Sequence, residues 1–200
     1  MPAKPDFVTV VSGVPRSGTS LMMAMLAAGG LEPLKDDVRA ADEDNPRGYF
    51  EFEAVKRLKA DSSWVAGAVG KVVKVVHVHV KDLPRAGVRY RVVLVKRDLA
   101  EVLRSQKKML ARRGAKGGNL TDERTMALYR KQVADLEAWL AAEPAFSVHV
   151  ADYNGILRDP RPAIAALNRF LGGGLDEEAM AREVDPGLYR SGSGGSIRDR

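Results

Sequence analysis

The 200-residue sequence contains no cysteine, which excludes disulfide bonds, thiolate metal ligands and cysteine nucleophiles. This absence is consistent with a reducing compartment, and we expect a cytoplasmic protein. Aromatic residues are also scarce, at 6%, and none is interleaved with the basic clusters. Because single-stranded nucleic acid is bound by stacking its bases on aromatic side chains, the composition argues against a nucleic-acid partner.

Long hydrophobic runs are absent as well. The longest apolar stretch, Leu21–Leu31, is far too short to cross a bilayer. The apolar run Phe7–Val11 is too short for the hydrophobic region of a signal peptide, and it leads directly into a glycine turn. We therefore expect no membrane insertion.

The charge balance is basic, with 32 lysine and arginine residues against 26 aspartate and glutamate residues, a formal net charge of +6. Such a charge is typical of a solvated basic surface or of a protein that binds a polyanion such as a nucleotide. Net charge does not distinguish between these two interpretations. The positions of the cationic residues in the sequence are needed to distinguish them.

Four valine-rich segments are predicted as buried strands: Phe7–Ser12, Val72–Val80, Arg91–Lys96 and Phe146–Val150. Three of them contain short continuous apolar runs, which are typical of parallel strands covered on both faces. Helical patterns fill the gaps. The predicted helices are Thr19–Ala28, one that starts at Leu99, one around 126–140 that ends before Pro144, and one from Asp159-Pro160 to the glycines at 172–174.

Strands that alternate with helices predict an α/β fold with a single doubly wound, mostly parallel sheet of the P-loop nucleotide-binding type. We assign this domain to residues 1–190 and interpret the Gly/Ser-rich basic segment 191–200 as a flexible tail. Residues 32–50 and 111–121 are predicted as polar loops, and we expect them to shape a ligand site.

A glycine-containing loop, Gly13–Ser20, lies between the first predicted strand and the first predicted helix. In an α/β fold this position binds phosphate, because backbone N–H groups and the helix N-terminus converge on an anion. The two glycines and the final serine match the Walker spacing GxxxxGK[ST], but Thr19 stands where the lysine belongs and Arg16 supplies a cation inside the loop. A kinase or NTPase needs that lysine for its β- and γ-phosphates, which argues against this alternative. The alternative to phosphate binding is that this glycine loop is only a turn that allows the strand and the helix to pack closely.

The segment Pro15-Arg16-Ser17-Gly18-Thr19-Ser20 resembles the 5′-phosphosulfate-binding loop, P-[KR]-S-G-[ST]-[ST], of the sulfotransferase superfamily. Arg97, after the third predicted strand, and Ser105, eight residues later, resemble the family's site for the 3′-phosphate of its co-substrate. An arginine fork and a hydroxyl suit a dianionic phosphate. The resemblance implies transfer of a sulfuryl group from 3′-phosphoadenosine 5′-phosphosulfate (PAPS) to a hydroxyl or amine acceptor, with no metal required.

Further segments extend the resemblance to roughly residues 6–190: Val150–Pro160 and Phe170-Leu171-Gly172 resemble the family's late strand-to-helix region, and Asp185–Arg190 resembles the closing segment of small bacterial members. The sequence departs from the vertebrate cytosolic branch. That branch has a lysine at the position of Arg16 and a closing motif with tryptophan and lysine, both absent here.

Sulfuryl transfer needs a base for the acceptor proton and cations for the leaving phosphate. The segment 44–53 resembles a stretch that carries the proposed base in bacterial and protein-modifying relatives, and we assign the base to Glu51, with Glu53 second. Both carboxylates could instead stabilise a helix N-terminus. Arg16 is assigned to the leaving group, with Lys74 as a candidate partner, although Lys74 could also reach solvent from a strand end.

His77 and His79 would share one face of the strand Val72–Val80, but a third metal ligand is not apparent in the sequence. Because histidine is the base in several sulfotransferase branches, His77 is an alternative to Glu51. A non-catalytic nucleotide- or nucleic-acid-binding module is a second alternative to the enzyme, with Arg112, Arg113 and Lys116 as its basic loop. The acceptor and the oligomeric state are not identified by the sequence.

Overall fold

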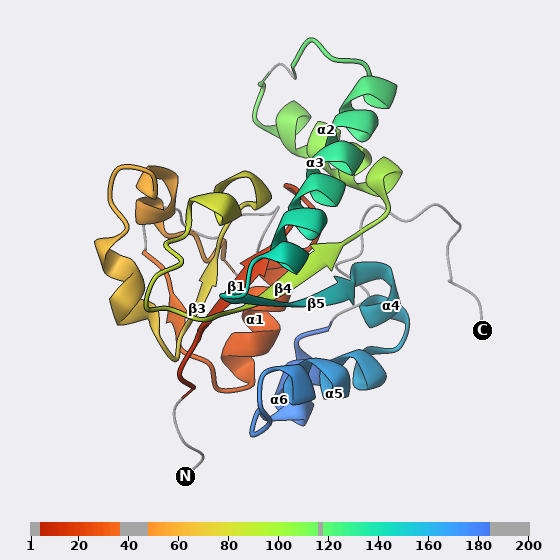
Figure 1. Cartoon of the computed structure of the whole chain (residues 1–200). Coiled ribbons are helices and arrows are strands. Elements are labelled where there is room, and N and C mark those ends of the chain that lie inside the picture. Colours follow the sequence, from red (N-terminus) through yellow and green to blue (C-terminus); the bar gives the residue numbers. More distant parts are fainter. Residues whose placement is uncertain (1–4, 37–47, 116–117, 185–200) are drawn as a thin grey trace, which may run out of the picture.

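The computed structural model describes residues 5–36, 48–115 and 118–184, and it contains one parallel sheet with helices packed on both faces (Figure 1). The sheet has five strands in the order β2-β3-β1-β4-β5, and every pair of neighbours is parallel. The strands are β1 (Val8–Ser12), β2 (Pro33–Leu34), β3 (Val72–Lys74), β4 (Tyr90–Lys96) and β5 (Phe146–Asp152). The predicted α/β fold with a parallel sheet is confirmed.

All four predicted helices are present in the structure. The α-helices are α1 (Thr19–Ala28), α2 (Leu99–Arg112), α3 (Asp122–Ala142), α4 (Tyr153–Arg158), α5 (Pro160–Phe170) and α6 (Glu177–Arg182), and the 3₁₀ helices are η1 (Glu53–Arg57), η2 (Ser63–Ala68) and η3 (His77–Asp82). Asp98 caps α2: its side chain accepts a hydrogen bond from the Glu101 backbone N–H. Among the described helices, none is long and apolar enough to cross a membrane.

Side chains alternate between the two faces of the central strands and are buried on both. Along β4, Val93 and Val95 join a core with α1, α5 and α6, whereas Val92 and Leu94 join a core with α3 and the 3₁₀ helices. Each face is therefore covered, which explains why these strands read as continuous valine-rich runs rather than as alternating patterns.

The predicted strand Val72–Val80 is wrong in its second half. β3 ends at Lys74, and η3 begins at His77. The cause lies in the neighbouring strand, because β1 ends at Ser12 and the chain then turns into the glycine loop. The backbone N–H groups of Val75 and His77 still donate to the carbonyl oxygens of Val11 and Gly13, but the pairing does not extend to Val80. The alternation of valine and histidine follows 3₁₀ geometry instead, since His77 and Val80 at i and i+3 are buried and Val78 is exposed.

The predicted polar loop 32–50 also contains a short edge strand, β2, that sequence reasoning missed because only two residues pair. The predicted tail at 191–200, the closing segment Asp185–Arg190 and the basic-loop residue Lys116 lie outside the described residues.

The strand order places β1 at the centre of the sheet, between β3 and β4. In open parallel sheets, ligands bind beyond the carboxyl ends of the strands, where the connections diverge to opposite sides. The glycine loop leaves β1 at this point. The topology therefore predicts a ligand site at the carboxyl ends of β1, β3, β4 and β5.

Candidate functional site

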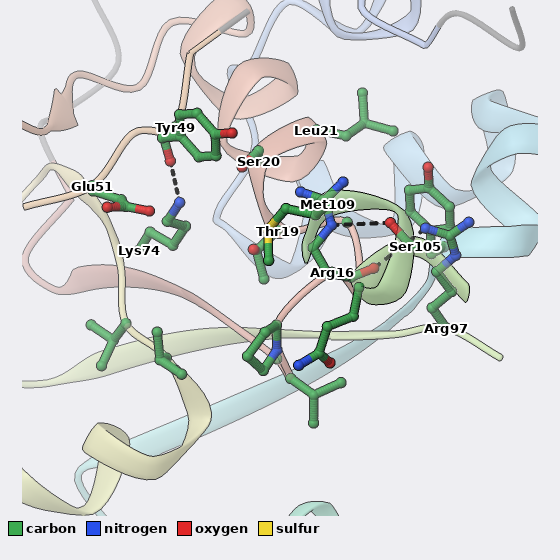
Figure 2. Close-up of a pocket in the computed structure, with 18 of the residues that line it drawn as sticks. Arg16, Thr19, Ser20, Leu21, Tyr49, Glu51, Lys74, Arg97, Ser105 and Met109 are labelled. Atoms are coloured by element: carbon green, nitrogen blue, oxygen red, sulfur yellow. Dashed lines mark hydrogen bonds between the residues drawn. The ribbon is translucent and has the colours of Figure 1, made fainter. Parts of the chain in front are cut away.

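A cavity of about 630 Å³ opens at this edge of the sheet (Figure 2). Six parts of the chain line it: the loop and first turn of α1 (13–21), residues 48–56, the end of β3 with the residues that follow it, Arg97 after β4, one face of α2 with Arg113 at its end, and α4. Each of Gly13, Val75, Arg97 and Tyr153 directly follows a strand and lines the cavity. The volume suits a nucleotide-sized ligand.

The glycine loop has a conformation that depends on Gly18. Its φ is +105°, in the left-handed region that other residues rarely adopt. A Cβ atom at Gly18 would lie 2.1 Å from Cδ2 of the Tyr153 ring, so the ring and the loop backbone pack without room for a side chain. A Cβ atom at Gly13 would lie 2.7 Å from the Val95 carbonyl oxygen. Contacts therefore require glycine at both predicted loop positions, and at Gly18 the backbone conformation requires it too.

Replacing Gly18 with alanine should lower the melting temperature more than replacing Gly30 does. Gly30 has nearly the same φ, +106°, but a Cβ there would meet no atom within 4 Å. Gly30→Ala should therefore cost only backbone strain, about 1–2 kcal/mol, whereas Gly18→Ala adds displacement of the Tyr153 ring. Differential scanning calorimetry of the two variants makes the comparison. Equal melting temperatures would mean that the ring moves away without cost.

Arg16, Arg97 and Ser105 come together although they are far apart in the sequence. Nε of Arg16 donates a hydrogen bond of 3.0 Å to Oγ of Ser105, and Nη1 of Arg97 donates one of 3.3 Å to the carbonyl oxygen of Arg16. Arg16 itself has a φ of +70°. The loop after β1, the end of β4 and the middle of α2 thus bring two guanidinium groups and a hydroxyl to one wall of the cavity (Figure 2).

Arg97 is buried, with a side-chain exposure of 6%, and it is paired. Its Nε donates a hydrogen bond of 3.1 Å to Glu101, and its guanidinium carbon lies 4.5 Å from the centre of the Tyr153 ring. A buried charge without such partners would be costly. Burial raises the pKa of the Tyr153 hydroxyl, while the nearby Arg97 charge lowers it.

Lys74 and Glu51 lie at the end of the cavity opposite Arg97 (Figure 2). Nζ of Lys74 donates a hydrogen bond to the backbone carbonyl oxygen of Tyr49, which holds the amine near Glu51 rather than in solvent. Glu53, the alternative base, does not line the cavity, and its carboxylate pairs with Lys56 at 2.5 Å on the surface.

The two histidines do not share a face. His77 is 5% exposed, lies outside the cavity lining, and places Nε2 2.9 Å from Oε1 of Gln132. His79 lines the cavity, with Nδ1 3.3 Å from Oδ2 of Asp82. Their predicted common face is wrong because η3 replaces the strand. No group of three metal-ligating side chains occurs in the described ranges.

Most of the predicted site residues line the cavity: Pro15, Arg16, Gly18, Thr19, Ser20, Glu51, Lys74, Arg97 and Ser105. Ser17 does not line it. Its side chain is fully buried, its Oγ makes no hydrogen bond within the described part of the chain, and its backbone N–H donates to the Val14 carbonyl oxygen.

Sequence reasoning missed Tyr153, His79 and Glu101. Tyr153 had a usable signal, since it lies three residues past the predicted strand Phe146–Val150 and the carboxyl ends of parallel strands meet at one edge. His79 was assigned to the same strand face as His77, and Glu101 was not assigned to the site.

The charge around the cavity is strongly asymmetric. Its described lining contains five cationic side chains, from Arg16, Lys56, Lys74, Arg97 and Arg113, and one carboxylate, from Glu51. Cations that converge in a partly enclosed site attract anions and stabilise charge that develops on a phosphate-like group. The arrangement can therefore hold a polyanionic ligand at the Arg97 end and place a carboxylate at the other end.

Comparisons with known proteins agree with this geometry. A family model described as "Sulfotransferase domain" matches residues 6–187. The sulfotransferase domain of the Synechococcus PCC 7002 olefin synthase superposes with a TM-score of 0.56 at 16% identity, covering 100% of this chain and 93% of that chain. The sulfotransferase domain from the curacin biosynthetic pathway gives 0.53 at 15% identity, covering 92% and 79%. At these identities the two structures show a shared fold. No curated protein matches the sequence. The extent of the family match establishes that the chain belongs to the sulfotransferase domain family.

Proposed function

We propose that this protein transfers a sulfuryl group from PAPS to a hydroxyl or amine acceptor. The observation that carries the proposal is the convergence of Arg16, Arg97 and Ser105 on one cavity wall beside a glycine loop whose Walker lysine is replaced by Thr19. PAPS has phosphates on both the 5′ and the 3′ oxygen of its ribose, and two adjacent groups, the glycine loop with Arg16 and the pair Arg97 and Ser105, match that distribution.

The residues present fit the co-substrate. The loop Pro15–Ser20, with the close packing of Gly18 on Tyr153, would hold the 5′-phosphosulfate through its backbone and hydroxyls. Arg97 and Ser105 would hold the 3′-phosphate, because an arginine fork with a neighbouring hydroxyl suits a dianion. Ser105 is then shared, since its Oγ also accepts a hydrogen bond from Arg16.

When bound, PAPS supplies a sulfuryl group attached to a phosphate leaving group. Arg16 and Lys74 would stabilise the negative charge that the phosphate gains, since both line the cavity. The Glu51 carboxylate would accept the proton of the acceptor hydroxyl. Phe52, Val55 and Met109 line the cavity too and would exclude water from an acceptor held there.

Thermal unfolding with nucleotides tests the proposal. The product 3′-phosphoadenosine 5′-phosphate should raise the melting temperature without metal, whereas ATP, with or without magnesium, should raise it far less. At a hundred times its Kd, a ligand adds about 2.7 kcal/mol of stability, a rise on the order of 5–10 °C for a chain of this size. Stabilisation by magnesium-ATP alone would favour a kinase or NTPase and remove the roles assigned to Arg97 and Ser105.

A further inference from the structure

A buried carboxylate lies directly behind the arginine that faces the cavity. Glu101 has a side-chain exposure of 7%, and its Oε2 atom accepts two hydrogen bonds, one of 3.1 Å from Nε of Arg97 and one of 3.2 Å from Nδ2 of Asn154. A negative charge at this place weakens the attraction between Arg97 and any anion. In a site that binds phosphate, the Glu101 carboxylate must therefore have a role that offsets this unfavourable charge.

Asn154 connects two strand ends through the same carboxylate. Its Oδ1 accepts a hydrogen bond of 3.3 Å from the backbone N–H of Asp98, at the start of α2. Its own backbone N–H donates to Oδ1 of Asp152 at 3.0 Å, at the start of α4. Glu101 and Asn154 thus join the junction between β4 and α2, which contains Arg97, to the junction between β5 and α4.

The guanidinium group of Arg97 is held by three different contacts. Glu101 accepts from Nε, the Arg16 carbonyl oxygen accepts from Nη1 at 3.3 Å, and the Tyr153 ring covers one face at 4.5 Å. Because the guanidinium is a planar fork, a partner on Nε and a ring on its face fix both its position and its rotation. Arg97 lines the cavity, whereas Glu101 does not.

We propose that Glu101 and Asn154 are positioning residues that order the Arg97 fork for the 3′-phosphate before the nucleotide binds. The inference rests on the proposed function, because it assumes that Arg97 binds this phosphate. A preordered arginine spares the ligand the entropic cost of fixing a long side chain, which offsets the opposing charge of the carboxylate. The role depends on one acceptor atom, Oε2, rather than on the charge of Glu101.

The test compares Glu101→Ala with Glu101→Gln by calorimetric titration of 3′-phosphoadenosine 5′-phosphate and of adenosine 5′-phosphate, which lacks the 3′-phosphate. Glu101→Ala should lower the affinity for 3′-phosphoadenosine 5′-phosphate by roughly tenfold and leave the affinity for adenosine 5′-phosphate unchanged. Glu101→Gln should retain the wild-type ratio, because its amide oxygen can replace Oε2 and accept both hydrogen bonds. The ratio of the two affinities in one sample cancels any loss of folded protein.

Two further variants complete the design. Glu137→Ala removes a carboxylate that pairs with Lys96 at the end of β4, at 2.6 Å and away from the cavity, and should leave the ratio unchanged. Asn154→Ala should lower the ratio roughly threefold to tenfold, and it decides the question if Glu101→Ala does not fold.

The outcomes separate the two proposals. If Arg97→Ala changes the ratio but neither Glu101→Ala nor Asn154→Ala does, the positioning role is wrong and the proposed function stands. A Glu101→Gln variant that binds the bisphosphate as weakly as Glu101→Ala would also overturn positioning, since the acceptor oxygen that it retains would then not order Arg97. If Arg97→Ala leaves the ratio unchanged, the 3′-phosphate assignment itself fails.

Discussion

Replacing Glu51 with glutamine should lower kcat by about 10²–10⁴-fold while the affinity for PAPS stays close to that of the wild type. Glutamine has nearly the same shape as glutamate but does not accept a proton, and removal of a general base has effects of this size. Glu51 lies near Lys74, at the end of the cavity away from Arg97, so the substitution leaves the nucleotide-binding wall intact (Figure 2).

Release of 3′-phosphoadenosine 5′-phosphate from PAPS, measured with the best acceptor from a panel of alcohols, sugars and amines, gives kcat. Glu53→Gln is the matched control, because Glu53 lies two residues away, outside the cavity lining and paired with Lys56. This control should keep its activity. A fully active Glu51→Gln enzyme would show that Glu51 is not the base. Glu53, His77 and the cavity-lining His79 would then be the candidates.

The order of strands and helices could be predicted because local sequence and global fold agree over most of the chain. The helix over Thr19–Ala28 has its predicted limits, and valine-rich runs mark strands with two covered faces. The segment after Lys74 failed for a tertiary reason. Its alternating pattern fits a strand, but β1 ends at Ser12 and the chain beside the segment turns into the glycine loop, so backbone pairing stops at the bond from His77 to Gly13 and η3 follows.

The candidate site was predictable where its signal is local. The spacing of the glycine loop and the eight residues between Arg97 and Ser105 are visible in the sequence, and these residues line one cavity. Contacts between distant segments are not visible. The Tyr153 ring over Gly18 and the hydrogen bond from Asn154 to Glu101 depend on how β1, β4 and β5 pair, and the sequence alone does not give that pairing.

Removing the Arg97 side chain should weaken the binding of 3′-phosphoadenosine 5′-phosphate by about 10–150-fold and leave ATP binding nearly unchanged. A hydrogen bond to a charged group contributes about 1.5–3 kcal/mol, and ATP has no 3′-phosphate to lose such a bond. Competition with a fluorescent adenine nucleotide measures both affinities on the same sample. Equal weakening of the two ligands would contradict the 3′-phosphate assignment.

The substitution needs a compensating change, because Arg97→Ala alone leaves the buried Glu101 carboxylate without its cation. Breaking a buried ion pair from one side destabilises a protein by about 3–5 kcal/mol, which would obscure the binding result. Arg97→Ala should therefore be made together with Glu101→Gln, which removes the charge and keeps the acceptor for Asn154. The double variant should melt at a higher temperature than Arg97→Ala and show the same loss of bisphosphate affinity. Since the charge balance of the buried pair is preserved, a selective loss in this background reports the missing guanidinium rather than a disturbed fold.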